Sequence, residues 1–160
     1  MRLKSVLLAI VLHGATAQPA FALLCGTGLD PVTVSATPVN FGSYMPTSAL
    51  ALVAGGTVKI SCGLGLDLLP NFTVALSQGN GGSYAPRAMI NGSMRLSYNL
   101  YTTAAYSTVW GDGTAGTAVQ SYTSPLQLGS ATFTAYGQLP AGQFAGAGLY
   151  TDTIVVTVTY

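Results

Sequence analysis

The side chains that most often perform acid–base and nucleophilic chemistry are scarce in this sequence. Its 160 residues contain no Glu and a single His, His13. General acid–base catalysis relies on His, Glu, Asp, Lys or Tyr in a pocket, and a nucleophilic triad needs a base beside its Ser or Cys. The acidic residues are far apart along the chain, near turns or strand ends: Asp30, Asp67, Asp112 and Asp152. We therefore predict that the protein is not an enzyme.

The first 22 residues have the pattern of a secretory signal peptide. A short basic start precedes the apolar run Ser5–Leu12, which is too short to cross a bilayer. Small residues follow and form two A-x-A cleavage patterns, at residues 15–17 and 20–22. We predict cleavage after Ala22, with Ala17 as the alternative. Residues 23–160 would then form one domain in an oxidising compartment, and His13 would be lost with the signal.

Two cysteines, Cys25 and Cys62, are the other residues with distinctive chemistry. Two thiols without a histidine do not complete the tetrahedral ligand set of a zinc site, so we expect no metal and no cofactor. An even number of cysteines behind a secretory signal is typical of a disulfide. We predict a Cys25–Cys62 disulfide. Two separate buried thiols are the alternative, and lipidation of Cys25 is disfavoured because the bulky Leu24 precedes it.

Charge is scarce throughout the chain. Only 6% of residues are charged and 49% are hydrophobic. After the predicted signal, the chain contains four Asp and three basic residues, which are Lys59, Arg87 and Arg95. This balance excludes a nucleic-acid partner, which needs a basic surface, and the hydrophobic content excludes a disordered chain.

The elements that must position these residues are predicted to be strands. Apolar and polar residues alternate with a period of two, most clearly in Thr153–Tyr160. The other predicted strands are Val32–Ala36, Thr57–Cys62, Phe72–Ser77, Arg95–Leu100 and Thr132–Tyr136. Gly-rich clusters between them predict turns at residues 63–65, 79–83, 111–114 and 145–148. The stretch Ser48–Ala54 could form one helical turn, ended by Gly55 and Gly56.

This pattern predicts an all-β protein, either a sandwich or a barrel. Eight strands of about ten residues would fit a small outer-membrane β-barrel, which stays an alternative. The alternating runs are shorter than a membrane-spanning strand, and Arg87 and Arg95 flank a core-like segment. The sandwich is therefore favoured.

Several segments taken in order carry a family resemblance. They are Val34–Tyr44, Ile60–Cys62, Gly82–Met89, Leu96–Thr102, Val109–Thr114, Tyr136–Gln143 and Gly148–Thr153. Together they resemble the spore coat protein U domain, a family that includes subunits of archaic, Csu-type chaperone–usher pili. The resemblance covers nearly all of residues 25–160.

The resemblance implies an immunoglobulin-like β-sandwich that lacks its last strand. Its expected partners are a periplasmic pilus chaperone that lends a strand, an outer-membrane usher, and a neighbouring pilus subunit whose N-terminal segment replaces the chaperone strand. The chain would travel through the periplasm to the cell surface. The residues expected to line the strand-exchange groove are Ile154, Val156, Val158 and Tyr160 on one edge, and Val32 and Val34 on the other.

One segment departs from the family pattern. Polymerising subunits carry alternating apolar residues before the first Cys, whereas cleavage after Ala22 leaves only Leu23 and Leu24 there. Pro19 would interrupt a ladder if cleavage followed Ala17. We therefore expect a tip or terminal subunit that supports adhesion and biofilm formation. A self-contained, spore-coat-like surface binding module is the alternative.

Overall fold

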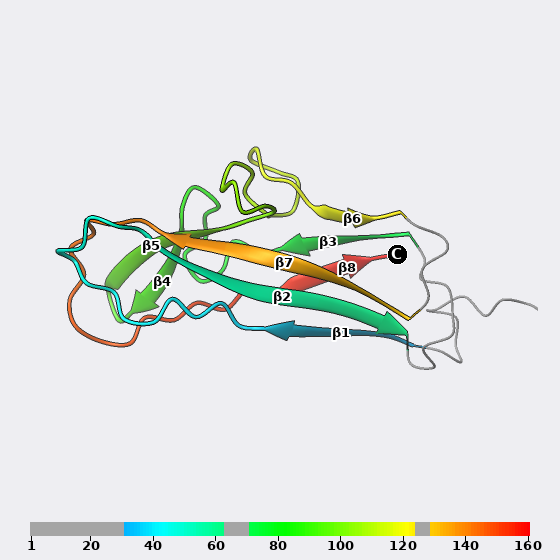
Figure 1. The fold of residues 1–160 in the computed structure, drawn as a ribbon, viewed down its shortest axis with the longest axis horizontal. Helices are drawn as coiled ribbons and strands as arrows, with labels where there is room; N and C mark the ends of the chain where they lie inside the picture. The colour runs from blue at the N-terminus through cyan, green and yellow to red at the C-terminus, as the bar shows by residue number, and fades with distance from the viewer. Residues whose placement is uncertain (1–30, 63–70, 124–128) are drawn as a thin grey trace, which may run out of the picture.

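The computed structural model describes residues 31–62, 71–123 and 129–160 (Figure 1). These ranges contain eight β-strands and no α-helix: β1 (Val32–Thr37), β2 (Leu52–Cys62), β3 (Phe72–Leu76), β4 (Arg87–Asn91), β5 (Met94–Tyr101), β6 (Gln120–Tyr122), β7 (Ser130–Leu139) and β8 (Val156–Thr159). Nothing in the described part of the chain is a helix of the length and hydropathy that crossing a membrane requires. The predicted all-β class is confirmed.

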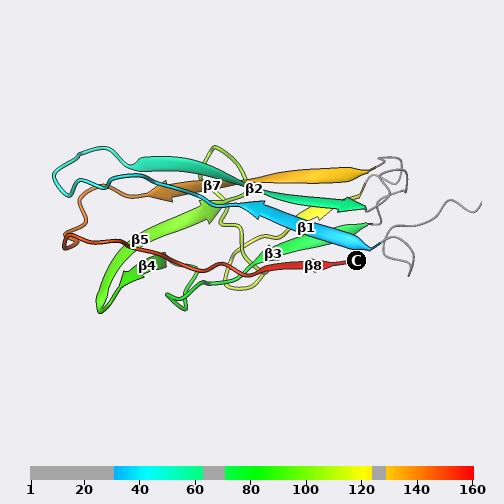
Figure 2. The same cartoon turned by 90° about the horizontal axis from the view of Figure 1, so that it is seen from below.

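The strands form two antiparallel sheets that lie in two layers (Figures 1 and 2). One sheet has the order β1-β2-β7-β5-β4, and the other has the order β6-β3-β8. Alternate residues of each sheet point into the space between the layers, as the period-2 pattern predicted. Val58 and Ile60 of β2 meet Phe72, Val74 and Leu76 of β3 in one buried cluster. The predicted sandwich is therefore confirmed.

Two strands differ from the sequence prediction in extent. β2 begins at Leu52 rather than Thr57, so the helical turn expected over Ser48–Ala54 is wrong. Gly55 and Gly56 do not end an element, because the long pairing with β7 continues through both of them. β8 is confined to Val156–Thr159.

Two further strands, β4 and β6, lack the alternating pattern that would have predicted them. β4 begins with Arg87 and Ala88, which are both buried, and β6 has only three residues. Both are edge strands: β4 pairs with β5, and β6 pairs with β3. Pairing with that neighbour, rather than an alternating pattern of its own, determines where each strand forms.

A fully buried arginine joins the two layers. The Arg87 guanidinium donates from Nε and Nη2 to the Ser77 carbonyl oxygen, at 2.9 and 2.8 Å, just beyond the end of β3. It also donates to the Trp110 carbonyl oxygen at 2.7 Å and to Asn99 Oδ1 on β5 at 2.8 Å. Burial lowers the pKa of Arg87 from its ordinary value, because desolvation disfavours the charged form. These hydrogen bonds, which we call the arginine clamp, satisfy a fully buried cation.

Candidate binding groove

Each sheet has an edge strand on the same side of the molecule. Among the described residues, β1 pairs only with β2, and β8 pairs only with β3. In Figure 1, β1 is the lowest strand of the five-stranded sheet and β8 is the lowest strand of the three-stranded sheet. Each of these strands therefore directs one row of backbone N–H and C=O groups away from its own sheet.

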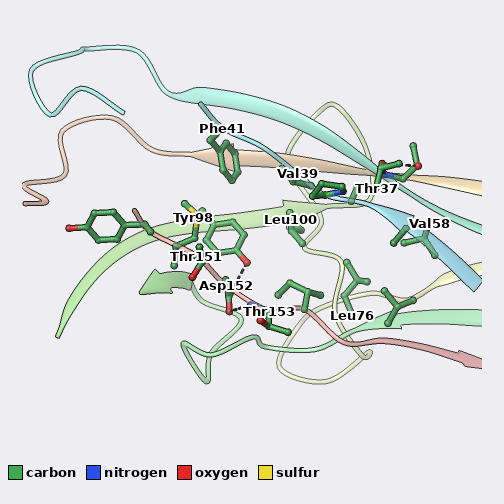
Figure 3. Close-up of a pocket in the computed structure, with 18 residues that line it drawn as sticks. Thr37, Val39, Phe41, Val58, Leu76, Tyr98, Leu100, Thr151, Asp152 and Thr153 are labelled. Carbon is green, nitrogen blue, oxygen red and sulfur yellow. Dashed lines mark hydrogen bonds between the residues drawn. The ribbon is translucent and has the colours of Figure 1, made fainter. Parts of the chain in front are cut away.

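A cavity of about 500 Å³ lies between these two edges. One wall is the end of β1 and the segment after it, and the other is the segment that leads into β8 (Figure 3). The wall residues are Ala36–Val39 and Phe41 on the β1 side, and Tyr150–Ile154 and Val156 on the β8 side. The cavity thus has the form of a groove where the end of β1 and the segment after it face the segment that leads into β8. The edge-strand residues that line it are Ala36, Thr37 and Val156.

The floor of the groove is the apolar core of the sandwich. Val58, Leu76 and Leu100 line it from three different strands, and their exposed fractions are 3%, 2% and 4%. Ala135 of β7 adds a small residue between them. An occupant of the groove would therefore contact the core directly, and apolar side chains would bind there best.

Glycines in β2 and β7 position the wall that follows β1. A Cβ on Gly137 would lie 2.7 Å from Val39 Cγ1 and 2.8 Å from Phe41 Cζ, so only glycine leaves room for both side chains. A Cβ on Gly56 would lie 2.7 Å from the Thr37 carbonyl oxygen. Phe41 in turn packs edge-on against Tyr98, with ring centroids 5.8 Å apart. The chain after β1 is thereby folded over the inner face of the sheet.

A carboxylate organises the opposite wall. Asp152 Oδ1 accepts hydrogen bonds from the backbone N–H groups of Asn80 and Thr153, at 2.6 and 2.7 Å. Its Oδ2 accepts the Tyr98 hydroxyl hydrogen at 2.7 Å (Figure 3). Burial raises the pKa of Tyr98, and the hydrogen bond to Asp152 raises it further. The tyrosine therefore stays protonated and links the groove floor to this wall.

The groove has no constellation for bond-making chemistry. Asp152 is its single charged lining residue, and its oxygens are occupied by the three donors described above. Within the described ranges, no group of three or more His, Cys, Asp or Glu residues could hold a metal ion. The geometry suits binding of an extended apolar segment.

The structure places the predicted groove residues at different depths. Ile154 and Val156 line the cavity. Val158 packs against the core farther along β8, and Tyr160 is 64% exposed. On β1, Val32 packs against the core and Val34 is 45% exposed; neither lines the cavity.

Other residues of the groove were not anticipated. They come mainly from the segment after β1 and from β5: Ala36, Val39, Phe41, Tyr98 and Leu100. The alternation of Val39 and Phe41 around Asn40 was the available signal. Pro38 concealed it, because a proline suggests that the strand has ended.

Of the two cysteines predicted to form a disulfide, only Cys62 lies within the described residues. Cys62 is buried at the end of β2, opposite Val32 in the register of β1 and β2. Cys25 and the predicted signal, residues 1–22, lie outside the described ranges. The Cys25–Cys62 disulfide and the domain boundary therefore stay predictions.

The amino-acid sequence is similar to a known family and to a known protein. Residues 16–157 match the family model of the Spore Coat Protein U domain. The chain is 35% identical over 139 residues to Protein U of Myxococcus xanthus, covering 76% of this chain and 71% of that protein.

The fold also resembles a solved structure. The neighbour is a chain of the CsuC–CsuE chaperone–tip adhesion subunit pre-assembly complex from the archaic chaperone–usher Csu pili of Acinetobacter baumannii, with a TM-score of 0.57 and 22% identity. The match covers 82% of this chain but only 40% of that chain, and at this identity it supports the fold alone. The family match over most of the sequence, the identity to Protein U and the two-sheet fold lead to one conclusion: the chain belongs to the Spore Coat Protein U domain family.

Proposed function

We propose that the chain is a structural subunit of a secreted chaperone–usher pilus or surface fibre, and that a partner's β-strand completes its sandwich in the groove. The observation that carries this proposal is the pair of edge strands, with an apolar cavity that the end of β1 and the start of β8 both line. Family membership and the fold of the Csu complex support the same assembly class.

Strand insertion would satisfy both edges at once. Neighbouring strands in a sheet lie about 4.8 Å apart and exchange backbone hydrogen bonds, which β1 and β8 can supply from their outer edges. Alternate side chains of the inserted strand would point toward Val58, Leu76 and Leu100. Val34 shares the inner face of its sheet with its register partner Ile60 yet is 45% exposed, and Val155 is 59% exposed; both would flank the new strand.

The proposed partners follow from this mechanism. A periplasmic chaperone would lend the strand first, an outer-membrane usher would receive the complex, and a neighbouring subunit would then replace the chaperone strand. The protein would reach the cell surface through the periplasm.

The position in the fibre is the finer part of the proposal. We place the chain at the tip or at a terminal position, where it would support adhesion and biofilm formation. The support is the sequence before Cys25, where Leu23 and Leu24 are the only apolar residues between the predicted Ala22 cleavage site and the cysteine. A strand-donating role requires a longer alternating segment.

A self-contained surface module is the second candidate. It is favoured by the burial of the groove floor within the chain itself, where Leu76 is 2% and Val58 is 3% exposed. A domain whose own chain already buries these core residues could fold without a donated strand.

The test compares periplasmic expression of the chain with and without a matching chaperone. The pilus-subunit proposal predicts soluble protein only in a stable complex with the chaperone. Soluble, cooperatively unfolding protein without any partner contradicts the proposal and favours the self-contained module.

Two variants test whether the chaperone binds in the groove. Val156→Glu places a charge in the groove, whereas Val155→Glu changes the adjacent residue, which is 59% exposed. We expect Val156→Glu to reduce the co-purified chaperone by about tenfold or more, because it buries an unpaired charge, and Val155→Glu to have little effect. Equal effects would show that the chaperone does not use the groove.

A further inference from the structure

Three side chains form a continuous bar across the groove. Phe41 extends from the segment after β1, Tyr98 from β5, and Asp152 from the segment that leads into β8. The Phe41 and Tyr98 rings meet edge-on with their centroids 5.8 Å apart, and the Tyr98 hydroxyl donates to Asp152 Oδ2 at 2.7 Å. Figure 3 shows the three side chains in one line from wall to wall. We call these three residues the crossbar.

Both ends of the crossbar are fixed by the chain behind them. A Cβ on Gly137 would lie 2.8 Å from Phe41 Cζ, so the phenylalanine ring rests directly on the backbone of β7. Asp152 Oδ1 accepts the backbone N–H groups of Asn80 and Thr153, at 2.6 and 2.7 Å. The crossbar therefore cannot move aside at either wall without losing contacts.

The crossbar also occupies the space above the groove floor at its own level. Tyr98 lines the cavity, yet only 4% of its surface is exposed, and both Phe41 and Asp152 are in contact with it. An additional large side chain that points inward here has to separate the two rings or displace the carboxylate. Displacement of Asp152 would leave the buried Tyr98 hydroxyl without its acceptor, which is costly.

The groove has more room where the two edge strands face each other. Ala36 is the last inward residue of β1; its register partner Val58 is buried, whereas Ala36 itself is exposed. Val156 lies on the opposite wall and pairs with the buried Leu76 of β3. Because Ala36 supplies only a methyl group, the space between Ala36 and Val156 suits a large apolar side chain.

An inserted strand would meet both places with residues of one face. Alternate side chains of a strand point the same way and recur about every 6.6 Å. Asp152 lies four positions before Val156 on the wall that the strand would follow. The crossbar is therefore met two inward positions beyond the roomy site, and the two places favour side chains of opposite size.

We propose that the crossbar fixes the register of the inserted strand, because it admits only a small inward side chain, whereas the site between Ala36 and Val156 admits a large one. Counted toward the crossbar, the partner strand is recognised by a large apolar residue such as Leu or Phe, and then by Gly, Ala or Ser. A strand shifted by two residues keeps its inward face but places side chains of the wrong size at these sites. The inference rests on the proposed function, in which a partner's strand fills the groove.

A strand appended to the chain itself tests the proposal without an identified partner. The chain enters β8 from the crossbar side and ends beyond Thr159 (Figure 1). An Asn-Gly turn placed after Tyr160 would return a segment of about ten residues along β8 toward the crossbar as a hairpin. The base segment alternates outward threonine with inward alanine. The predicted signal at the N-terminus is left unchanged.

The measurement is the urea midpoint of unfolding as leucine replaces one inward alanine of the appended segment at a time. We expect leucine to raise the midpoint at the position opposite Val156 and to lower it four residues later, at the crossbar. In Phe41→Ala, leucine at the crossbar position should raise the midpoint instead, because the ring that excludes it is gone. If Phe41→Ala does not fold, Phe41→Leu gives the same comparison with a smaller shift.

Phe144→Ala is the matched control for the loss of a phenylalanine. Phe144 is 97% exposed and does not line the groove, so this change should leave the response to leucine unaltered at every position of the appended segment.

Two outcomes would overturn the inference alone. One is a midpoint that leucine raises at every inward position, and the other is a leucine penalty at the crossbar that the Phe41 variants leave unchanged. A third outcome would overturn the proposed function together with the inference. In that case the alanine segment would give no more soluble, urea-resistant protein than a segment with proline at alternate positions, which cannot donate the backbone hydrogen bonds of a ladder.

Discussion

At the scale of single residues, buried polar groups decide how the two layers meet. Arg87 has no exposed surface, and its donors reach the Ser77 and Trp110 carbonyls and Asn99. The face of its guanidinium also lies over the Tyr84 ring, 4.9 Å from the centroid. Buried charges are costly unless hydrogen-bonded, so this constellation is stable only because its acceptors are already in place.

The arginine clamp predicts a large difference between two similar substitutions. Arg87→Met removes the side-chain donors to the Ser77 and Trp110 carbonyls and leaves Asn99 Oδ1 with Leu100 N alone, and we expect the free energy of unfolding to fall by about 2 kcal/mol or more. Arg95→Met is the control, because Arg95 is exposed and makes a single 3.2 Å hydrogen bond to Gly81 O; it should change stability by about 0.5 kcal/mol or less. Urea denaturation measures both. Equal small effects would mean that the clamp does not stabilise the fold.

Tyr98 predicts a loss of stability in alkali. Its pKa in the folded chain is raised by burial and by Asp152, whereas the unfolded phenol titrates at the ordinary 10.0. Above pH 10 the unfolded state loses a proton that the folded state keeps, so the free energy of unfolding declines as pH rises. Tyr98→Phe should flatten this decline, which can reach about 1.4 kcal/mol per pH unit for one group.

The alkaline experiment compares denaturant midpoints on either side of pH 10 for the parent and Tyr98→Phe. Tyr84 should leave a residual slope in the variant, because burial raises its pKa as well. Parallel pH profiles for the two proteins would rule out Tyr98 as the source of the decline.

At the scale of elements, small residues in β2 and β7 determine where the chain after β1 can run. Gly56 and Gly137 are buried on the inner face, and the space above them is filled by Val39 and Phe41. The five-stranded sheet is therefore covered on part of its inner face by its own chain rather than by the shorter opposing sheet. This is why the groove has a wall on that side.

Gly137→Val tests that arrangement. The new side chain would overlap Val39 and Phe41, and we expect a loss of about 1–3 kcal/mol in unfolding free energy. Gly55→Val is the matched control, because no atom lies within 4 Å of its added Cβ and valine favours strands. Thermal unfolding of both variants gives the comparison. A similar loss in the two variants would show that the effect of replacing Gly137 comes from the backbone and not from overlap with the segment that covers it.

At the scale of the whole molecule, the side that carries the groove differs from the rest of the sandwich. It exposes the free backbone edges of β1 and β8, which could pair with another strand, and such edges favour aggregation unless they are covered.

The predicted disulfide would act on the whole fold. A Cys25–Cys62 bond closes a loop around β1 and β2, and the chain-entropy model gives about 3–4 kcal/mol for a loop of this length. Alkylation of the unfolded, unreduced chain should add no mass, and reduction should add two alkyl groups and lower the unfolding free energy. Addition of two groups without reduction would contradict the pairing.

The sequence by itself determined the class of fold and much of its strand content. Alternation in Phe72–Leu76 and in Val156–Thr159 reports a strand with one buried face, and this signal is local, so no partner is needed to detect it. The scarcity of charge and the lack of Glu argue against nucleic-acid binding and common catalytic sites, and both stay predictions. Ile154 and Val156 line the cavity, and the part that they were predicted to play in strand exchange stays a prediction.

Only the tertiary structure decided the rest of the groove and the arginine clamp. Arg87 is a polar residue yet fully buried, because acceptors distant in sequence surround it. Val39 and Phe41 line a wall because glycines on other strands leave them room, which no local pattern reports. Gln143 N donates to the Tyr44 hydroxyl and so joins two connections that are distant in sequence. Local periodicity records which face of a strand is buried, whereas these features depend on contacts between residues that only the folded chain brings together.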